Sequence, residues 1–189
     1  MKYADTKVVF REVPDEITLA VNISGCPVGC KGCHSPYLSE DIGQPLDASS
    51  LEALIEANSG ISCVSLMGGD ADPAFVAELC RGVKNSHPAL KTCWYSGRGL
   101  DRAGEVLPWL DYIKVGPWVE ECGPLDSPTT NQRFYAVLHD GPGGPVPSSS
   151  FSTGLGRPCE AGTASPAIPA LPVGICLEDR TARFRRKLI

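Results

Sequence analysis

The amino-acid sequence predicts an α/β fold with a mostly parallel sheet, and three observations support this prediction. Apolar or β-branched runs of strand length recur along the first two thirds of the chain. Segments with helical periodicity separate several of these runs, as in chains that alternate strands and helices. The run at residues 17–23 is nearly continuous in apolar or β-branched residues, which is typical of strands buried on both faces. With 189 residues, the chain is long enough for one domain with its own core.

The first elements expected are strands at residues 8–10 and 17–23, followed by a cysteine-containing loop. Residues 47–58 are then expected to form a helix, which Ser49 and Glu52 would open as a capping box. An apolar stripe at helical spacing predicts that this helix packs against the sheet.

The alternation of strand and helix continues to about residue 115. Residues 61–67 predict a strand, and Asp72 followed by Pro73 predicts a helix start, because aspartate caps helices and proline fits their first turn. The remaining expected elements are a strand at 91–95, a helix at 100–107 and a strand at 112–115.

The composition changes near residue 138, which we take as the end of a core spanning residues 1–138. Gly, Pro and Ser make up 19 of the 36 residues from 141 to 176, and such a composition buries too little apolar surface to order itself. We therefore expect a flexible insertion at 139–176. Residues 177–189 form a basic tail, for which the simplest interpretation is a solvated segment, and packing on the domain or on a partner is the alternative.

Charge and composition limit the function classes. The net charge of −5 gives no electrostatic footprint for nucleic acid, and no apolar run reaches the length that spans a membrane. The first 16 residues have no apolar signal-peptide region, so we expect a cytoplasmic protein. Nine cysteines in such a chain favour metal or redox chemistry over a disulfide framework.

Three of these cysteines, Cys26, Cys30 and Cys33, have the spacing C-x3-C-x2-C in a glycine-rich loop directly after a predicted strand. This spacing wraps one loop around an ion or cluster. A 4Fe–4S cluster with four cysteine ligands is saturated and only passes electrons. With three, one iron stays open for a ligand from outside the protein, so the loop predicts a site for chemistry.

Two alternatives stay open for this loop besides cysteines with no ligand at all. Three thiolates and His34 could form a structural zinc site, although adjacent residues such as Cys33 and His34 rarely both reach one tetrahedral ion. An iron–sulfur electron carrier would need a fourth cysteine close by, and the next is Cys63, far along the chain. Cys63, Cys80 and Cys93 follow strand or helix patterns and are expected in the core.

Further polar loops are expected beside the cysteines, because ligands of parallel α/β sheets bind at the carboxyl ends of the strands. The loops that fall there are the cysteine loop, Gly68-Gly69-Asp70, Ser96-Gly97-Arg98 and Lys114-Val115-Gly116. A single glycine pair is more often a plain turn. The four loops together predict one shared ligand site at the carboxyl ends of the strands.

The cysteine spacing, with Gly-Gly-acidic after the next strand, resembles the radical S-adenosylmethionine superfamily. The resemblance implies a partial, open (β/α) barrel with mostly parallel strands. It also implies a 4Fe–4S cluster on three thiolates, whose open iron binds the amino and carboxylate groups of S-adenosylmethionine. One electron from the cluster would cleave this cofactor to methionine and a 5′-deoxyadenosyl radical.

Within this superfamily, residues 7–135 resemble the family of anaerobic ribonucleoside-triphosphate reductase activating proteins. The motifs that carry the resemblance are Ser24-Gly25-Cys26-Pro27, Cys33-His34-Ser35-Pro36, Leu66-Met67-Gly68-Gly69-Asp70, Trp94-Tyr95-Ser96-Gly97-Arg98, Tyr112-Ile113-Lys114-Val115-Gly116 and the segment 125–133. The partners implied are the large reductase subunit and a reduced flavodoxin- or ferredoxin-type electron donor. The glycine- and proline-rich stretch after residue 138 departs from the family.

The resemblance also assigns site residues. The cluster ligands would be Cys26, Cys30 and Cys33, and the cofactor contacts would come from Gly32, Cys33, His34, Gly68, Gly69, Asp70, Ser96 and Lys114. Gly32 and His34 would lie on the adenine side, and the glycine pair with Asp70 would lie near the methionine ammonium. Ser96 and Lys114 would contact ribose and carboxylate, although a structural role stays open for both.

Together these observations predict a radical S-adenosylmethionine oxidoreductase that generates a glycyl radical on the reductase. The short chain leaves little material for a small-substrate pocket, so a protein partner could close the site. The alternatives are an activase of another glycyl-radical enzyme such as a formate lyase, and a small-molecule enzyme such as a deazapurine synthase. An iron–sulfur carrier or a zinc module is the alternative outside enzymes.

Overall fold

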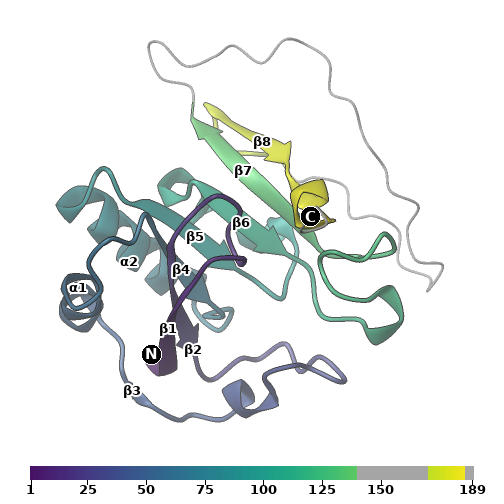
Figure 1. The fold of residues 1–189 in the computed structure, drawn as a ribbon, viewed down its shortest axis with the longest axis horizontal. Helices are drawn as coiled ribbons and strands as arrows, with labels where there is room; N and C mark the ends of the chain where they lie inside the picture. The colour runs from purple at the N-terminus through teal and green to yellow at the C-terminus, as the bar shows by residue number, and fades with distance from the viewer. Residues whose placement is uncertain (140–169, 186–189) are drawn as a thin grey trace.

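The structure is a computed structural model that describes residues 1–139 and 170–185 (Figure 1). These residues contain an eight-stranded sheet in the order β3-β1-β2-β4-β5-β6-β7-β8. The strands are β1 (Lys2–Val9), β2 (Thr18–Ile23), β3 (Gln44–Pro45), β4 (Cys63–Met67), β5 (Lys91–Tyr95), β6 (Tyr112–Val115), β7 (Arg133–His139) and β8 (Ile175–Asp179). In the part of the chain described, no helix has the length and apolar character to cross a membrane.

The sheet is mixed. Its centre is parallel, because β2, β4, β5 and β6 pair in parallel in that order. The flanking pairs β1–β2, β1–β3, β6–β7 and β7–β8 are antiparallel. The predicted α/β class is confirmed. The prediction that the strands are mostly parallel is wrong for the sheet as a whole. β1 and β2, like β6 and β7, follow each other in the chain without an α-helix between them, and such connections give antiparallel pairs.

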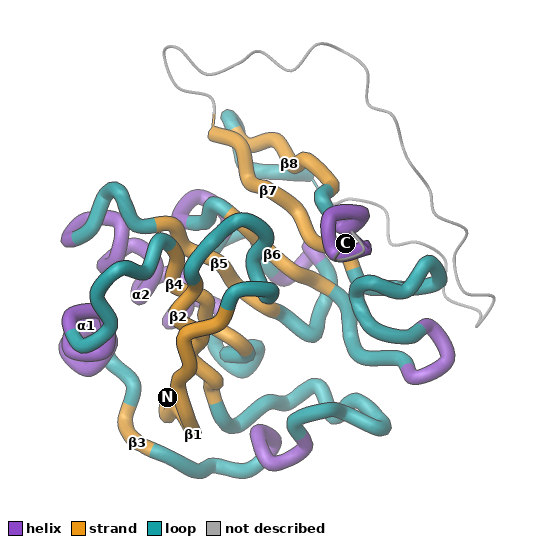
Figure 2. Tube along the Cα trace, viewed as in Figure 1, coloured by secondary structure: helices purple, strands orange, loops and turns teal. Residues whose placement is uncertain are grey.

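Two helices, α1 (Ala48–Glu56) and α2 (Pro73–Ser86), lie beside each other on one side of the central strands (Figures 1 and 2). Both bury apolar side chains in the larger core cluster, as Leu51 and Leu79 do. A smaller cluster contains Cys63 of β4, Cys93 of β5 and Phe134 of β7. Cys80 belongs to the larger cluster. The core positions expected for Cys63, Cys80 and Cys93 are therefore confirmed.

The helix starts show how local chemistry sets the element bounds. Asp72 caps α2 as predicted, because its Oδ1 accepts a hydrogen bond from the backbone N–H of Phe75 at 3.1 Å. The predicted capping box of α1 is wrong in its residues. Asp47 and Ser50 form it instead, each side chain accepting from the other's backbone N–H at 2.8 Å. Asp47 is the N-cap residue and Ser50 is the third residue of the helix, so Ser49 already lies within the first turn and cannot cap it.

The predicted helix at 100–107 is wrong. The segment forms two short 3₁₀ turns, Leu100–Arg102 and Leu107–Trp109, separated by an irregular stretch. Gly104 lies between the turns and disfavours a continuous helix, since glycine loses the most backbone freedom when it becomes helical. The apolar residues that suggested a helix are nevertheless buried, and they fill the core from these turns.

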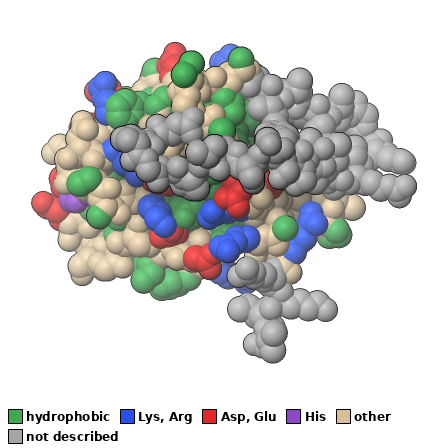
Figure 3. Space-filling model, turned by 90° about the horizontal axis from the view of Figure 1, so that it is seen from above, with side chains coloured by type: hydrophobic (Ala, Val, Ile, Leu, Met, Phe, Trp, Pro, Cys, Tyr) green, Lys and Arg blue, Asp and Glu red, His purple; other side chains and the backbone are tan. Residues whose placement is uncertain are grey.

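The end of the chain packs on the domain. Most of the expected insertion at 139–176 lies outside the described residues, and its last two residues begin β8, which pairs with β7. In the tail, residues 181–185 form a 3₁₀ turn, and the ring of Phe184 packs edge-on against Phe134 at 5.0 Å between ring centroids. The solvated interpretation is therefore wrong for the described part of the tail. Basic and acidic side chains lie next to one another on the face in Figure 3, and Arg183 pairs with Asp15.

Candidate functional site

The carboxyl ends of the four central strands lie at one edge of the sheet, because these strands are parallel. The cysteine loop leaves β2 there, Gly68-Gly69-Asp70 leaves β4, Ser96-Gly97-Arg98 leaves β5 and Gly116 follows β6. The structure therefore brings the expected loops together at the edge where ligands of such sheets bind.

Backbone hydrogen bonds close the base of the cysteine loop. The N–H of Gly25 donates to the carbonyl of Glu40 at 3.0 Å, and the N–H of Cys26 donates to the carbonyl of Leu38 at 2.8 Å. Within the loop, Gly25, Gly29 and Gly32 all have positive φ angles near 70°. Residues with a side chain rarely adopt positive φ angles, so the glycines permit the tight turns of the loop.

The three thiols of this loop are half-buried and not bridged by disulfides. The sulfur of Cys30 accepts a hydrogen bond from the backbone N–H of Trp118 at 3.3 Å, and that of Cys33 accepts one from Ser35 at 3.4 Å. Burial raises the pKa of the Cys26 thiol, against a backbone N–H of Val28 that lowers it. Backbone N–H groups directed at sulfur suit thiolates that hold an iron–sulfur cluster.

In the part of the chain described, no three His, Cys, Asp or Glu side chains are placed to hold one metal ion. A four-iron cluster differs from a single ion, because each thiolate binds a separate iron. The free thiols and their N–H donors therefore fit a cluster by their chemistry.

The glycine pair after β4 allows close packing between strands and helix. A Cβ on Gly68 would lie 2.9 Å from the carbonyl oxygen of Ile23, and one on Gly69 would lie 2.7 Å from a methyl carbon of Val76. Both carbonyl oxygens of the pair already accept hydrogen bonds. Gly68 accepts from the indole N–H of Trp94 at 2.7 Å, and Gly69 accepts from the backbone N–H of Asp72, the residue before α2, at 3.1 Å.

Asp70 and Ser96 join the ends of β4 and β5. Asp70 is buried, and its carboxylate accepts hydrogen bonds from the Ser96 hydroxyl at 2.5 Å and from the Gly97 N–H at 3.1 Å. The Ser96 oxygen in turn accepts from the Arg98 N–H at 2.9 Å. These bonds fix the relative positions of the two strand ends at the site.

Lys114 is a buried cation at the same edge, and its Nζ donates to the carbonyl of Gly116 at 2.7 Å. Burial lowers its pKa to about 8, although the negative charges of Cys30, Asp70 and Cys33 act in the opposite direction. Lys114 therefore lies within electrostatic range of the cysteine loop and of Asp70.

The sequence did not point to Trp118, whose ring centroid lies 4.1 Å from that of His34. A Cβ on Gly32 would lie 3.5 Å from both the Trp118 indole nitrogen and a carboxylate oxygen of Glu120. The loop after β6 thus packs against the last part of the cysteine loop. No local sequence signal could have indicated this, because Trp118 and Cys30 are 88 residues apart.

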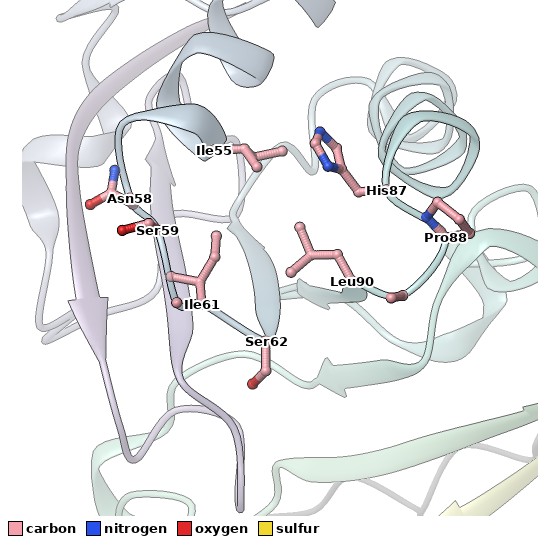
Figure 4. Close-up of a pocket in the computed structure, with 10 residues that line it drawn as sticks. Ile55, Asn58, Ser59, Ile61, Ser62, His87, Pro88 and Leu90 are labelled. Carbon is pink, nitrogen blue, oxygen red and sulfur yellow. The ribbon is translucent and has the colours of Figure 1, made fainter.

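A cavity of about 490 Å³ lies elsewhere, at the amino ends of β4 and β5 (Figure 4). Its lining includes Ile55, Ile61, His87 and Leu90, whose side chains Figure 4 shows around the opening. It contains none of the residues that the sequence indicated for the site. The candidate site is therefore the open edge around the cysteine loop.

Comparison with known proteins adds one match. A family model described as a 4Fe-4S single cluster domain matches residues 17–121, which is more than half of the chain and includes all four loops at the carboxyl edge. No curated protein and no solved structure matches the chain.

Proposed function

Because the chain belongs to the 4Fe-4S single cluster domain family, we propose that Cys26, Cys30 and Cys33 hold its cluster in a radical S-adenosylmethionine enzyme. The observation that carries this proposal is the set of three free thiols in one loop, beside the carboxyl ends of parallel strands. A three-cysteine cluster supplies an open iron and one electron. This combination suits reductive cleavage of S-adenosylmethionine.

The surrounding residues support the binding of that cofactor. His34 follows the third cysteine, and its packing on Trp118 would hold the imidazole ring for contact with the adenine. The carbonyls of Gly68 and Gly69 each keep a second lone pair for the methionine ammonium, since a carbonyl oxygen can accept two hydrogen bonds. Asp70 would add negative charge there.

Two further polar residues would complete the cofactor site. Lys114 would supply positive charge to the carboxylate of the cofactor, because its ammonium has donors beyond the one used by Gly116. The Ser96 hydroxyl donates to Asp70 and accepts from the Arg98 N–H, which leaves one lone pair for a ribose hydroxyl, so we propose that Ser96 chiefly positions Asp70.

The fold is compatible with a partial, open (β/α) barrel. The four central strands, with α1 and α2 on one side, would be its barrel-like part, and the antiparallel strands at both flanks would be additions to it. The active edge would then be the carboxyl edge of β2, β4, β5 and β6.

The proposed substrate is a protein, namely the large subunit of an anaerobic ribonucleoside-triphosphate reductase, on which the enzyme generates a glycyl radical. The cavity of about 490 Å³ lies away from the cysteine loop, so it offers no small-substrate pocket beside the proposed cluster. A protein partner would cover the edge and exclude water from it. The electron would come from a reduced flavodoxin- or ferredoxin-type protein.

The test uses anaerobically reconstituted protein, a chemical reductant, S-adenosylmethionine and the reductase. We expect slow formation of 5′-deoxyadenosine by the protein alone, and a glycyl radical signal in electron paramagnetic resonance after the reductase is added. Cys30→Ala should abolish both.

Other outcomes separate the alternatives. A glycyl signal on a formate lyase but not on the reductase would identify the protein as the activase of that lyase. Stoichiometric 5′-deoxyadenosine formation driven by a small molecule would favour a small-molecule enzyme. A stable cluster that never cleaves S-adenosylmethionine would favour an electron carrier.

A further inference from the structure

Trp118 contacts the cysteine loop through both its backbone and its ring. Its backbone N–H donates to the sulfur of Cys30 at 3.3 Å, and its ring packs on His34. Its indole Nε1 is buried without a hydrogen-bond partner among the described residues, and it lies 3.5 Å from the position of a Cβ on Gly32. One residue therefore contacts the second half of the loop at both Cys30 and His34.

The loop that carries Trp118 is itself fixed from the other side. The side-chain amide of Asn131 donates to the carbonyl of Pro117 at 3.0 Å. The amide of Gln132 lies 3.4 Å from the carbonyls of both Gly116 and Pro117. This support comes from the segment that enters β7, and it orients the Trp118 N–H before any cluster is bound.

A hydrogen bond to a cluster thiolate changes the reduction potential. The reduced cluster carries one more negative charge than the oxidised cluster, and a donor at the sulfur stabilises that charge. Hydrogen bonds to charged acceptors are also stronger than those to neutral ones. An N–H held at the sulfur therefore raises the potential at which the cluster accepts an electron.

We propose that Trp118 is a positioning residue that holds the cysteine loop and raises the cluster's reduction potential through its N–H bond to Cys30. This inference rests on the proposed cluster ligands. It assigns to the segment after β6 a role in electron acceptance that is separate from the binding of S-adenosylmethionine.

The direct test is isotopic. Protein grown with [¹⁵N]tryptophan and reconstituted with iron and sulfide is reduced, and pulsed electron paramagnetic resonance measures ¹⁵N coupling to the cluster spin. We expect a coupling that is lost in Trp118→Phe, because phenylalanine keeps a ring and the backbone N–H but carries no label. Trp109→Phe is the matched control and should keep the coupling, since Trp109 packs in the larger core cluster.

The second measurement is the midpoint potential of the cluster. Trp118→Ala should lower it relative to the wild type, because the loop loses its contact with His34 and the N–H is held less firmly. Trp118→Phe should stay closer to the wild type. Should Trp118→Ala fail to fold, the labelled wild type and Trp118→Phe still decide the question.

The outcomes separate this inference from the proposed function. A bound cluster that shows no tryptophan ¹⁵N coupling, or whose potential is the same in Trp118→Ala, overturns this inference alone. A wild-type protein that binds no cluster overturns both.

Discussion

Val28 in the cysteine loop packs directly against Gly97 at the end of β5. A Cβ on Gly97 would lie 2.9 Å from one methyl carbon of Val28 and 3.2 Å from the other. The glycine after β5 is therefore part of the surface on which the cysteine loop rests, and this contact links two loops that are distant in the sequence.

This contact predicts the effect of Gly97→Ala. The added methyl group should displace Val28 and the loop, at a cost of about 1–3 kcal/mol that is typical of overpacking. We expect less iron bound per chain after anaerobic reconstitution and a lower melting temperature. Combining it with Val28→Ala should restore both, because the double variant removes the clash. Wild-type iron content in the single variant would show that the loop adapts.

The cluster ligands give the second prediction. Cys26→Ala, Cys30→Ala and Cys33→Ala should each abolish a cluster of close to four iron and four sulfide per chain, because a methyl group cannot replace a thiolate as a ligand. Iron and sulfide analysis measures the effect. Cys176→Ala in β8 is the control and should keep the cluster. Zinc bound in place of iron, or a cluster that survives all three changes, would contradict the proposed site.

The third prediction concerns Glu16, a buried carboxylate at the other edge of the sheet. Burial opposes its ionisation, but hydrogen bonds outweigh this effect and lower its pKa below the usual value. The donors are Lys91, the Ser62 hydroxyl at 2.6 Å and the Tyr112 hydroxyl at 2.9 Å. Glu16→Gln should cost about 1–3 kcal/mol at neutral pH, as when a buried hydrogen-bonded group loses its partners.

The pH dependence of this effect follows from the sign of the shift. A carboxylate with a lowered folded-state pKa contributes stability above its unfolded value of about 4.3, and the contribution is lost as the pH falls through the folded value. The difference between wild type and Glu16→Gln in urea unfolding should therefore shrink below about pH 4. Glu105→Gln at an exposed position is the control and should show little change at any pH. An undiminished difference in acid would contradict the ionic role of Glu16.

The fourth prediction concerns the Gly/Pro/Ser-rich segment. Its composition predicts that a short Gly/Ser linker in place of residues 141–169 leaves the cluster content and S-adenosylmethionine cleavage largely intact. The pairing of His139 with Ile175 supports this design, because the strands on either side already run beside each other. A strong loss of cluster in the linker variant would show that the segment contributes to the site.

A matched truncation tests the contribution of β8, the strand after the Gly/Pro/Ser-rich segment. Removing residues 141–179 also deletes β8 and leaves β7 as an exposed edge, while Ile175 leaves the core. We expect this variant to be less stable in thermal unfolding than the linker variant. Equal melting temperatures would mean that β8 adds little to the fold.

The sequence by itself determined the features that depend on neighbouring residues. Apolar runs predicted the central strands, with the bounds of β5 and β6 as observed, and Asp72 with Pro73 predicted the start of α2. The spacing of the three cysteines identified the loop, because that spacing is a local property. Placing the four loops at one edge required only that the central strands be parallel.

Only the tertiary structure decided the rest. The direction of β1, β7 and β8, the packing of Phe184 and the contacts of Trp118 with Cys30 depend on segments that are far apart in the sequence. Residues 100–107 carry a helical apolar pattern, yet they fill the core as short turns. Periodicity reports which side chains become buried, whereas the partners of each side chain are set by the packing of the whole chain.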